Sequence, residues 1–117
     1  MVAVVDDDQS FRDALQRLLK SAGFAVQSFA SAEDFLKSGQ QQHTGCLITD
    51  IRMPGMSGLE LQSKLNSDHC LIPTIFITAH GDERMRLQAM RAGAVKFLSK
   101  TFEGETLLEA VRVALKN

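Results

Sequence analysis

Residues 46–58 have the sequence CLITDIRMPGMSG, in which a short apolar run meets an acid and leads into a loop. The run Cys46–Thr49 is typical of a buried strand, because it is short and continuously apolar. The residues after Asp50 include Pro and two Gly, which favour a loop. Leucines then recur over residues 59–65 with helical spacing. This segment predicts a strand–loop–helix unit with Asp50 at the carboxyl end of the strand.

The same alternation of strand and helix occurs four more times along the chain. The other predicted strands are Val2–Val5, Ala25–Phe29, Pro73–Thr78 and Val95–Leu98. The other predicted helices are one over residues 11–22, a short one that opens at residues 31–34, one over about residues 82–92, and a last one defined by apolar residues from 107 to 115. Continuously apolar strands separated by helices predict a parallel sheet that is covered on both faces. We expect one α/β domain over residues 1–117, with Asn117 at the end of the last helix.

The composition excludes several classes of protein. Among 117 residues, 13 are Lys or Arg and 14 are Asp or Glu, so the formal net charge is -1. This balance, together with the absence of Trp and Tyr, argues against a nucleic-acid-binding domain. No apolar run approaches the roughly 18 residues of a membrane span, and the N-terminus does not fit a signal peptide. We therefore expect a cytoplasmic domain that contacts neither membrane nor nucleic acid.

Polar residues follow or end four of the predicted strands. Asp6–Asp8 follow the first strand, Asp50 follows the third, Thr78 ends the fourth, and Lys100 follows the fifth. In parallel α/β sheets, sites form at the carboxyl ends of the strands. If the first and third strands are neighbours, their acids converge and disfavour one another's ionised forms. A divalent cation with oxygen ligands removes this penalty, which points to Mg²⁺.

This set of residues fits phosphoryl transfer. Asp50 would attack phosphorus as a carboxylate nucleophile and form an acyl phosphate. The metal and Lys100 would offset charge on the transferring oxygens, and the Thr78 hydroxyl would donate a hydrogen bond to one of them. Taken alone, Lys100 also fits a surface lysine, and Asp8 fits a helix N-cap. The hypothesis therefore rests on the joint placement of these residues.

The strand-end residues resemble those of a response-regulator receiver domain of two-component signalling. The resemblance is carried by VVDD at 4–7, DIRMPGMSGLEL at 50–61, IFITAHGD at 75–82 and AGAVKFLSK at 92–100. It covers essentially the whole chain, and the second of these segments is most similar to receivers of the FixJ/NarL group. It implies a flavodoxin-like (βα)5 fold, a doubly wound parallel five-stranded sheet with strand order 2-1-3-4-5.

The resemblance also implies a metal site. Asp6 and Asp7 match the acid pair of the family, so we expect Asp7 to bind Mg²⁺ (or Mn²⁺) directly and Asp6 to bind it through water. Asp50 and the backbone carbonyl of Arg52 are the further expected ligands.

The resemblance implies a signalling domain rather than an enzyme. Asp50 matches the residue that accepts a phosphoryl group from a sensor histidine kinase, and Lys100 matches the phosphate-binding lysine. Thr78 and Phe97 match the switch hydroxyl and the switch aromatic, although Phe97 also fits packing at the core edge. Phosphorylation would change the face formed by the fourth helix, fifth strand and fifth helix, which commonly supports dimerisation and controls an attached DNA-binding domain.

Three positions add expectations of their own. Thr101 stands where the family usually has Pro, often after a cis bond. Because a non-proline cis bond costs about 2.5–4 kcal/mol, against about 0.5–1 kcal/mol before proline, we expect a trans Lys100–Thr101 bond. Arg52 and His80 lie two residues beyond the acceptor and the switch threonine. Their side chains either affect the water that hydrolyses the acyl phosphate or simply face solvent.

Three other functions fit parts of the pattern. A phosphohydrolase similar to the haloacid dehalogenases would place D-x-D after the first strand, whereas Asp50-Ile51-Arg52 follows the third. A flavodoxin-like FMN-binding module needs a phosphate loop, where Asp6–Asp8 would repel the phosphate. A pseudo-receiver that binds partners without phosphorylation is favoured only by Thr101. Among the receivers, the FixJ/NarL resemblance favours a domain excised from a transcription factor over a stand-alone one.

Overall fold

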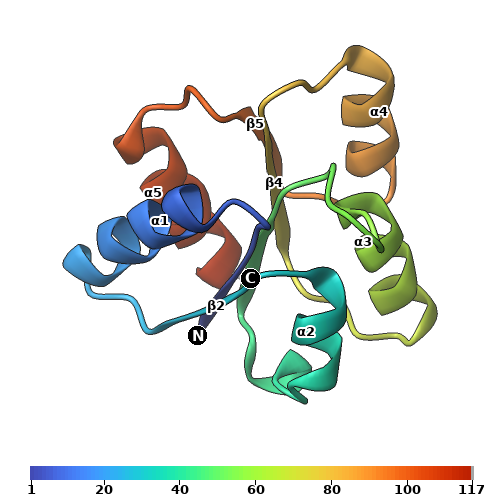
Figure 1. Cartoon of the computed structure of the whole chain (residues 1–117), viewed down its shortest axis with the longest axis horizontal. Helices are drawn as coiled ribbons and strands as arrows, with labels where there is room; N and C mark the ends of the chain where they lie inside the picture. Colours follow the sequence, from blue (N-terminus) through green and yellow to red (C-terminus); the bar gives the residue numbers. More distant parts are fainter. Residues whose placement is uncertain (117) are drawn as a thin grey trace.

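A computed structural model describes residues 1–116 as five parallel strands alternating with helices (Figure 1), and Asn117 lies outside the described residues. The strands are β1 (Val2–Val5), β2 (Val26–Phe29), β3 (Cys46–Thr49), β4 (Thr74–Thr78) and β5 (Lys96–Ser99). The helices are α1 (Gln9–Ser21), α2 (Ala32–Lys37), α3 (Gly58–Ser67), α4 (Glu83–Arg91) and α5 (Gly104–Lys116), with a 3-10 turn, η1, at Gln41–His43. The sheet order is β2-β1-β3-β4-β5, which confirms the predicted flavodoxin-like fold.

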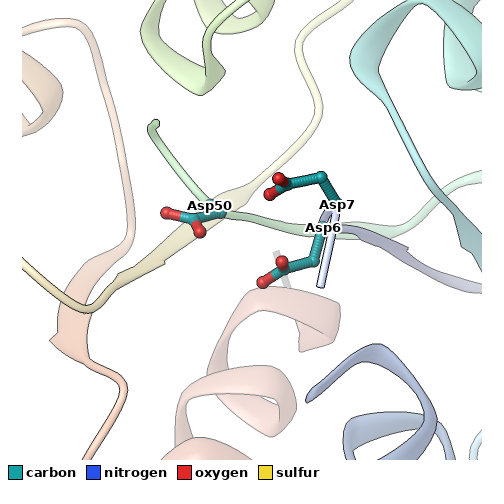
Figure 2. Close-up of side chains that lie close together, drawn as sticks. All are labelled: Asp6, Asp7 and Asp50. Atoms are coloured by element: carbon teal, nitrogen blue, oxygen red, sulfur yellow. The ribbon is translucent and has the colours of Figure 1, made fainter. Parts of the chain in front are cut away.

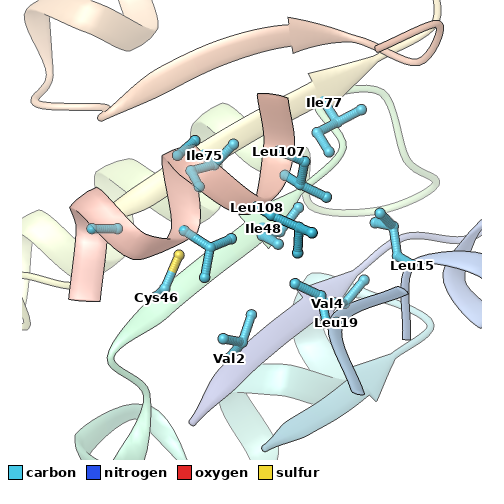
Figure 3. Close-up of a cluster of buried hydrophobic side chains, with 13 residues drawn as sticks. Val2, Val4, Leu15, Leu19, Cys46, Ile48, Ile75, Ile77, Leu107 and Leu108 are labelled. Carbon is cyan, nitrogen blue, oxygen red and sulfur yellow. The ribbon is translucent and has the colours of Figure 1, made fainter. Parts of the chain in front are cut away.

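The helices cover both faces of the sheet because successive residues of a strand point to opposite sides. Val2 and Val4 pack with α1 and α5, whereas Ala3 and Val5 pack with α2 and α3. Figure 1 shows α1 and α5 on one side of the sheet and α2, α3 and α4 on the other. Figure 3 shows the first of these two core layers, in which α5 lies across β3 and β4. The strands are therefore held on both faces, and their carboxyl ends have a fixed common edge.

Several helices begin with a side-chain cap soon after a strand ends. Asp8 accepts a hydrogen bond from the backbone N–H of Phe11, as predicted, and Ser31 and Asp82 cap α2 and α4 in the same way. Ser57 and Glu60 form a reciprocal capping box at the start of α3. None of the helices within residues 1–116 is both long enough and apolar enough to cross a membrane.

The strand boundaries differ slightly from the prediction. The second and fourth strands begin one residue later than expected, at Val26 and Thr74, and the fifth is shifted by one residue, to Lys96–Ser99. Pro73 has no backbone N–H to donate to the ladder, so it precedes β4 rather than joining it. These shifts leave the residues at the carboxyl ends of the strands unaffected.

Helix α4 is connected to α3 at its carboxyl end. The side-chain amide of Gln62 donates to the carbonyl of Ala89 at 3.1 Å, and that of Asn66 donates to the carbonyl of Ala92 at 3.1 Å. Gln62 is buried, so its amide needs this partner. These two bonds fix the end of α4 that lies away from the strand-end residues.

Candidate functional site

The predicted acids meet at the carboxyl edge of the sheet. Asp6 and Asp7 follow β1, Asp50 follows β3, and these strands are neighbours in register, with Val5 opposite Thr49. The three side chains each offer a carboxylate oxygen, and these oxygens all lie within 4.8 Å of one another. Figure 2 shows Asp6 and Asp7 on one loop and Asp50 at the end of the adjacent strand. The predicted convergence of the three acids is confirmed.

The three carboxylates have different surroundings. Asp6 is 1% exposed and Asp50 is 6% exposed, whereas Asp7 faces solvent. Burial raises the pKa of the Asp6 carboxyl, although the backbone N–H of Asp8, 2.8 Å from Oδ1, and the ammonium of Lys100 partly offset it. The backbone N–H of Ile51 donates to Asp50 Oδ1 at 2.6 Å, which orients that side chain. Asp6 therefore holds a charge that its environment disfavours.

Lys100 places its ammonium between the two buried acids. Its Nζ lies 3.0 Å from Asp50 Oδ2 and 3.1 Å from Asp6 Oδ2. Burial opposes the charge on Lys100, but the two carboxylates outweigh it, so the pKa of Lys100 is above its usual value. Among the described salt bridges Lys100 pairs with Asp6 and Asp50 but not with Asp7, so the three carboxylates carry more negative charge than this ammonium offsets. This charge and the oxygen-only donor set fit a hard divalent cation.

The predicted switch residues lie on the β4–β5 side of this edge. Thr78 is buried at the end of β4, and its carbonyl accepts a hydrogen bond from the backbone N–H of Lys100 at 3.1 Å. Phe97 is half-buried and packs against Phe76, with ring centroids 6.5 Å apart. A Cβ at Gly81 would lie 2.8 Å from the Phe97 ring, so the β4–α4 loop passes directly over that ring. Phe97 thus lies at the edge of the core, beside the loop that follows Thr78.

Arg52, His80 and Thr101, for which the sequence led to separate expectations, lie around the site. Arg52 is exposed and reaches towards α4, with Nη2 3.9 Å from Met85 Sδ. His80 is exposed. The peptide bonds described for residues 1–116 are all trans, so the Lys100–Thr101 bond has the expected geometry. Lys100 nevertheless reaches both buried acids, so the trans bond does not withdraw it from the site.

Two residues that position the site were missed from the sequence. Arg12 Nη1 donates to the Asp6 carbonyl at 2.6 Å, and Glu33 accepts from the Met56 backbone N–H at 3.0 Å. Arg12 follows the cap Asp8 by four residues, so it lies one turn into α1 on the same side, and this spacing could have identified it. Glu33 contacts a loop 23 residues away. No local pattern predicts such a contact.

Comparisons with known proteins agree with this geometry. The sequence pattern of the family described as response regulator receiver domain matches residues 2–112. The chain is 47% identical over 116 residues to the response regulator protein TmoT of Ectopseudomonas mendocina, covering 99% of this chain and 53% of that protein. It is 44% identical over 114 residues to the transcriptional regulatory protein FixJ of Azorhizobium caulinodans, covering 97% and 54%. The chain thus spans about half the length of these curated relatives.

Solved structures give the same result. The crystal structure of FixJ-N superimposes with a TM-score of 0.89 at 43% identity, covering 99% of this chain and 93% of that one. The response regulator StyR superimposes with a TM-score of 0.91 at 51% identity, covering 98% and 58%. The phosphohydrolase and FMN-binding alternatives are therefore set aside. The chain belongs to the response regulator receiver domain family, so it is a signalling domain of a two-component system, and its relatives include FixJ-type transcriptional regulators.

Proposed function

We propose that Asp50 accepts a phosphoryl group from a phosphohistidine of the sensor kinase that a two-component receiver implies. An Asp50 carboxylate oxygen forms a bond to phosphorus while the nitrogen–phosphorus bond of the donor breaks, and the imidazole leaves. The product is an acyl phosphate, which water later hydrolyses. The observation that carries this proposal is the Lys100 ammonium 3.0 Å from an Asp50 oxygen, beside two further carboxylates.

Asp6, Asp7 and Asp50, with the backbone carbonyl of Arg52, are the proposed ligands of Mg²⁺ or Mn²⁺. Their oxygen donors and excess negative charge support this assignment. The bound cation supplies positive charge that stabilises the phosphoryl oxygens during transfer. Asp50 and Asp6 are held in place by the N–H groups of Ile51 and Asp8, so the ligands are oriented before the cation binds.

Lys100 and Thr78 act on the phosphoryl group during and after transfer. Lys100 exchanges its ion pair with Asp50 for a contact with a phosphoryl oxygen, and the Thr78 hydroxyl donates a hydrogen bond to another. Movement of Thr78 then changes the packing of Phe97 beside the β4–α4 loop. The phosphoryl group thereby biases a two-state equilibrium of the face formed by α4, β5 and α5.

This face is the proposed site of a phosphorylation-dependent homodimer. Leu87 and Met90 of α4 are 39% and 37% exposed, and Val113 of α5 is 44% exposed. Such apolar side chains favour burial against a second copy. The dimer would control transcription through a DNA-binding domain outside residues 1–117, which form one receiver unit that does not itself contact nucleic acid. We place the protein in the cytoplasm, where its sensor kinase would phosphorylate it.

The test is phosphorylation by acetyl phosphate with Mg²⁺, followed by intact mass and peptide mapping. The wild-type chain should gain the mass of one phosphoryl group on the peptide that contains Asp50. Asp50→Asn should abolish the adduct, and chelation of Mg²⁺ should prevent it. Asp68→Asn is the matched control, because Asp68 is an exposed acid at the end of α3 that pairs only with Lys64 among the described salt bridges.

Two results would contradict the proposal. One is an adduct that persists in Asp50→Asn at the wild-type rate, and the other is a wild-type chain that takes up no phosphoryl group. Sustained release of phosphate from a phosphomonoester would instead indicate a hydrolase.

A further inference from the structure

The turn that carries Lys100 is closed without a proline. The backbone N–H of Phe102 donates to the carbonyl of Ser99 at 3.2 Å, and the hydroxyls of Ser99 and Thr101 lie 2.8 Å apart. Thr101 does not fix its backbone φ angle as a proline ring would. The backbone of this turn therefore has fewer constraints than a Lys-Pro turn, and the position of the Lys100 side chain depends more on its contacts.

The Lys100 side chain makes a contact outside the acid cluster. Its Nζ lies 4.6 Å from the ring centroid of Phe11, which is within the range of a cation–π interaction. Phe11 belongs to the first turn of α1, where its backbone N–H donates to the cap Asp8. The ring that faces the ammonium is thus attached to the helix that follows the acid pair.

The Phe11 ring is supported in turn by Phe102. The two rings meet edge to face, with centroids 6.2 Å apart and an interplanar angle of 89°. Both rings are half-buried and pack against the core layer between the sheet and α5. Phe11 therefore contacts both the ammonium of Lys100 and a residue of the turn from which Lys100 projects.

We propose that Phe11 is a positioning residue for phosphoryl transfer. Its ring holds the Lys100 ammonium towards Asp50, and Phe102 packs against that ring. A lysine side chain has several rotatable bonds, and its ammonium is free to hydrate when nothing confines it. The ring face contacts Nζ in addition to the carboxylates and leaves the attraction of Nζ to anions intact. This inference rests on the proposed role of Asp50 as the phosphoacceptor.

The test measures the rate constant of Asp50 phosphorylation by acetyl phosphate and Mg²⁺, followed by intact mass. Phe11→Leu keeps an apolar side chain but removes the ring, and should slow phosphorylation about threefold to tenfold. Phe11→Tyr keeps the ring face and should restore a rate within about twofold of wild type. Phe24→Leu is the matched control, because Phe24 packs against the same core layer without facing Lys100, and it should leave the rate unchanged.

A second measurement separates positioning from general destabilisation. In a Lys100→Met background, which lacks the ammonium, Phe11→Leu should cause no further loss of rate. An equal loss in both backgrounds, an equal loss in Phe24→Leu, or failure of Phe11→Tyr to restore the rate would overturn the inference. An unmodified wild-type chain would overturn the proposed function as well, whereas normal phosphorylation of Phe11→Leu would overturn this inference alone.

Discussion

The loops after β1 and β3 are held by polar contacts from several sides, whereas the loop after β4 is exposed along its length. We call residues 6–8 and 50–58 the acid half of the site, and residues 78–82 and 97–103 the switch half. In the acid half, Arg12 and Glu33 each bond to the loop backbone from a neighbouring helix. In the switch half, residues 79–82 are all exposed, and Asp82 caps α4.

This difference suits a domain that must hold a reactive group and also change shape. Carboxylates that share a cation need fixed positions, since a shift in one alters the charge felt by the others. A loop with few buried contacts opens at little cost in free energy, and it is therefore the part that a small change at Thr78 can move. Gln62 and Asn66 of α3 hold the carboxyl end of α4 by hydrogen bonds. We therefore expect the conformational change to be largest in the first turn of α4 and in the loop that precedes it.

The largest expected effect contrasts one glycine from each half of the site. A Cβ at Gly58 would collide with the Asp50 carbonyl and lie 3.1 Å from Ile51 Cα, and both neighbours are backbone that cannot move aside. We expect Gly58→Ala to lower the free energy of unfolding by about 3 kcal/mol. At Gly81 the neighbours are the Phe97 ring and the Thr78 methyl group, at 2.8 Å, which can rotate. Gly81→Ala should cost about 1 kcal/mol.

Urea unfolding of the two variants measures this contrast. If Gly81→Ala destabilised the chain as much as Gly58→Ala, the switch half would be as rigid as the acid half, and the comparison would fail. Gly81→Ala should also alter the phosphorylation-dependent change of the α4–β5–α5 face, because the added methyl group occupies space beside Phe97.

The two halves also differ in how far they could be predicted from sequence. The parallel strands and the position of Asp50 follow from short apolar runs that end in acids, which is information contained within a few consecutive residues, whereas the sheet order was implied by the family resemblance. The resemblance supplied the roles of Thr78 and Phe97, but neither it nor the local pattern predicts that Phe97 lies beneath Gly81. That contact depends on how the β4–α4 loop closes over β5, and loop closure is not encoded in the period of apolar residues.

Contacts between elements far apart in the chain were the main omission. Glu33 reaches Met56, and Lys100 reaches Phe11, because the fold brings α2 to the β3–α3 loop and the loop after β5 to α1. A single glutamate or phenylalanine has too many possible partners for its sequence position to identify the right one. The missed residues therefore support the site from outside, while the residues found from sequence form its charged centre.

A smaller effect tests the electrostatic cost of the acid half. Because burial raises the pKa of Asp6, the folded state binds a proton at Asp6 more tightly than the unfolded state does. The stability contributed by Asp6 therefore falls as pH rises from its usual pKa through the raised value, and it stays low at pH 7. In EDTA at neutral pH, we expect the free energy of unfolding of Asp6→Asn to be about 1 kcal/mol higher than that of wild type.

The measurement is urea unfolding at several pH values, with and without Mg²⁺. The gap between Asp6→Asn and wild type should narrow as pH falls, and Mg²⁺ should stabilise wild type more than the variant. Glu33, whose pKa is lowered chiefly by the hydrogen bond from the Met56 N–H, gives the stability of both chains the opposite pH dependence. This contribution cancels when the free energies of unfolding of the two chains are subtracted. A wild-type chain that is more stable than Asp6→Asn in EDTA at pH 7 would show that the Lys100 ion pair outweighs burial.

The smallest expected effect concerns His80 in the switch half. Its exposed side chain faces water, and an exposed side chain without fixed partners rarely changes a free energy by more than about 0.5 kcal/mol. We therefore expect His80→Ala to change the lifetime of the Asp50 acyl phosphate by about twofold at most. His43→Ala is the control, because His43 is exposed in η1, before β3, and should leave the lifetime unchanged. A larger effect of His80→Ala alone would mean that the loop over Phe97 orders the imidazole near the attacking water. The switch half would then contribute to the chemistry as well as to the change of shape.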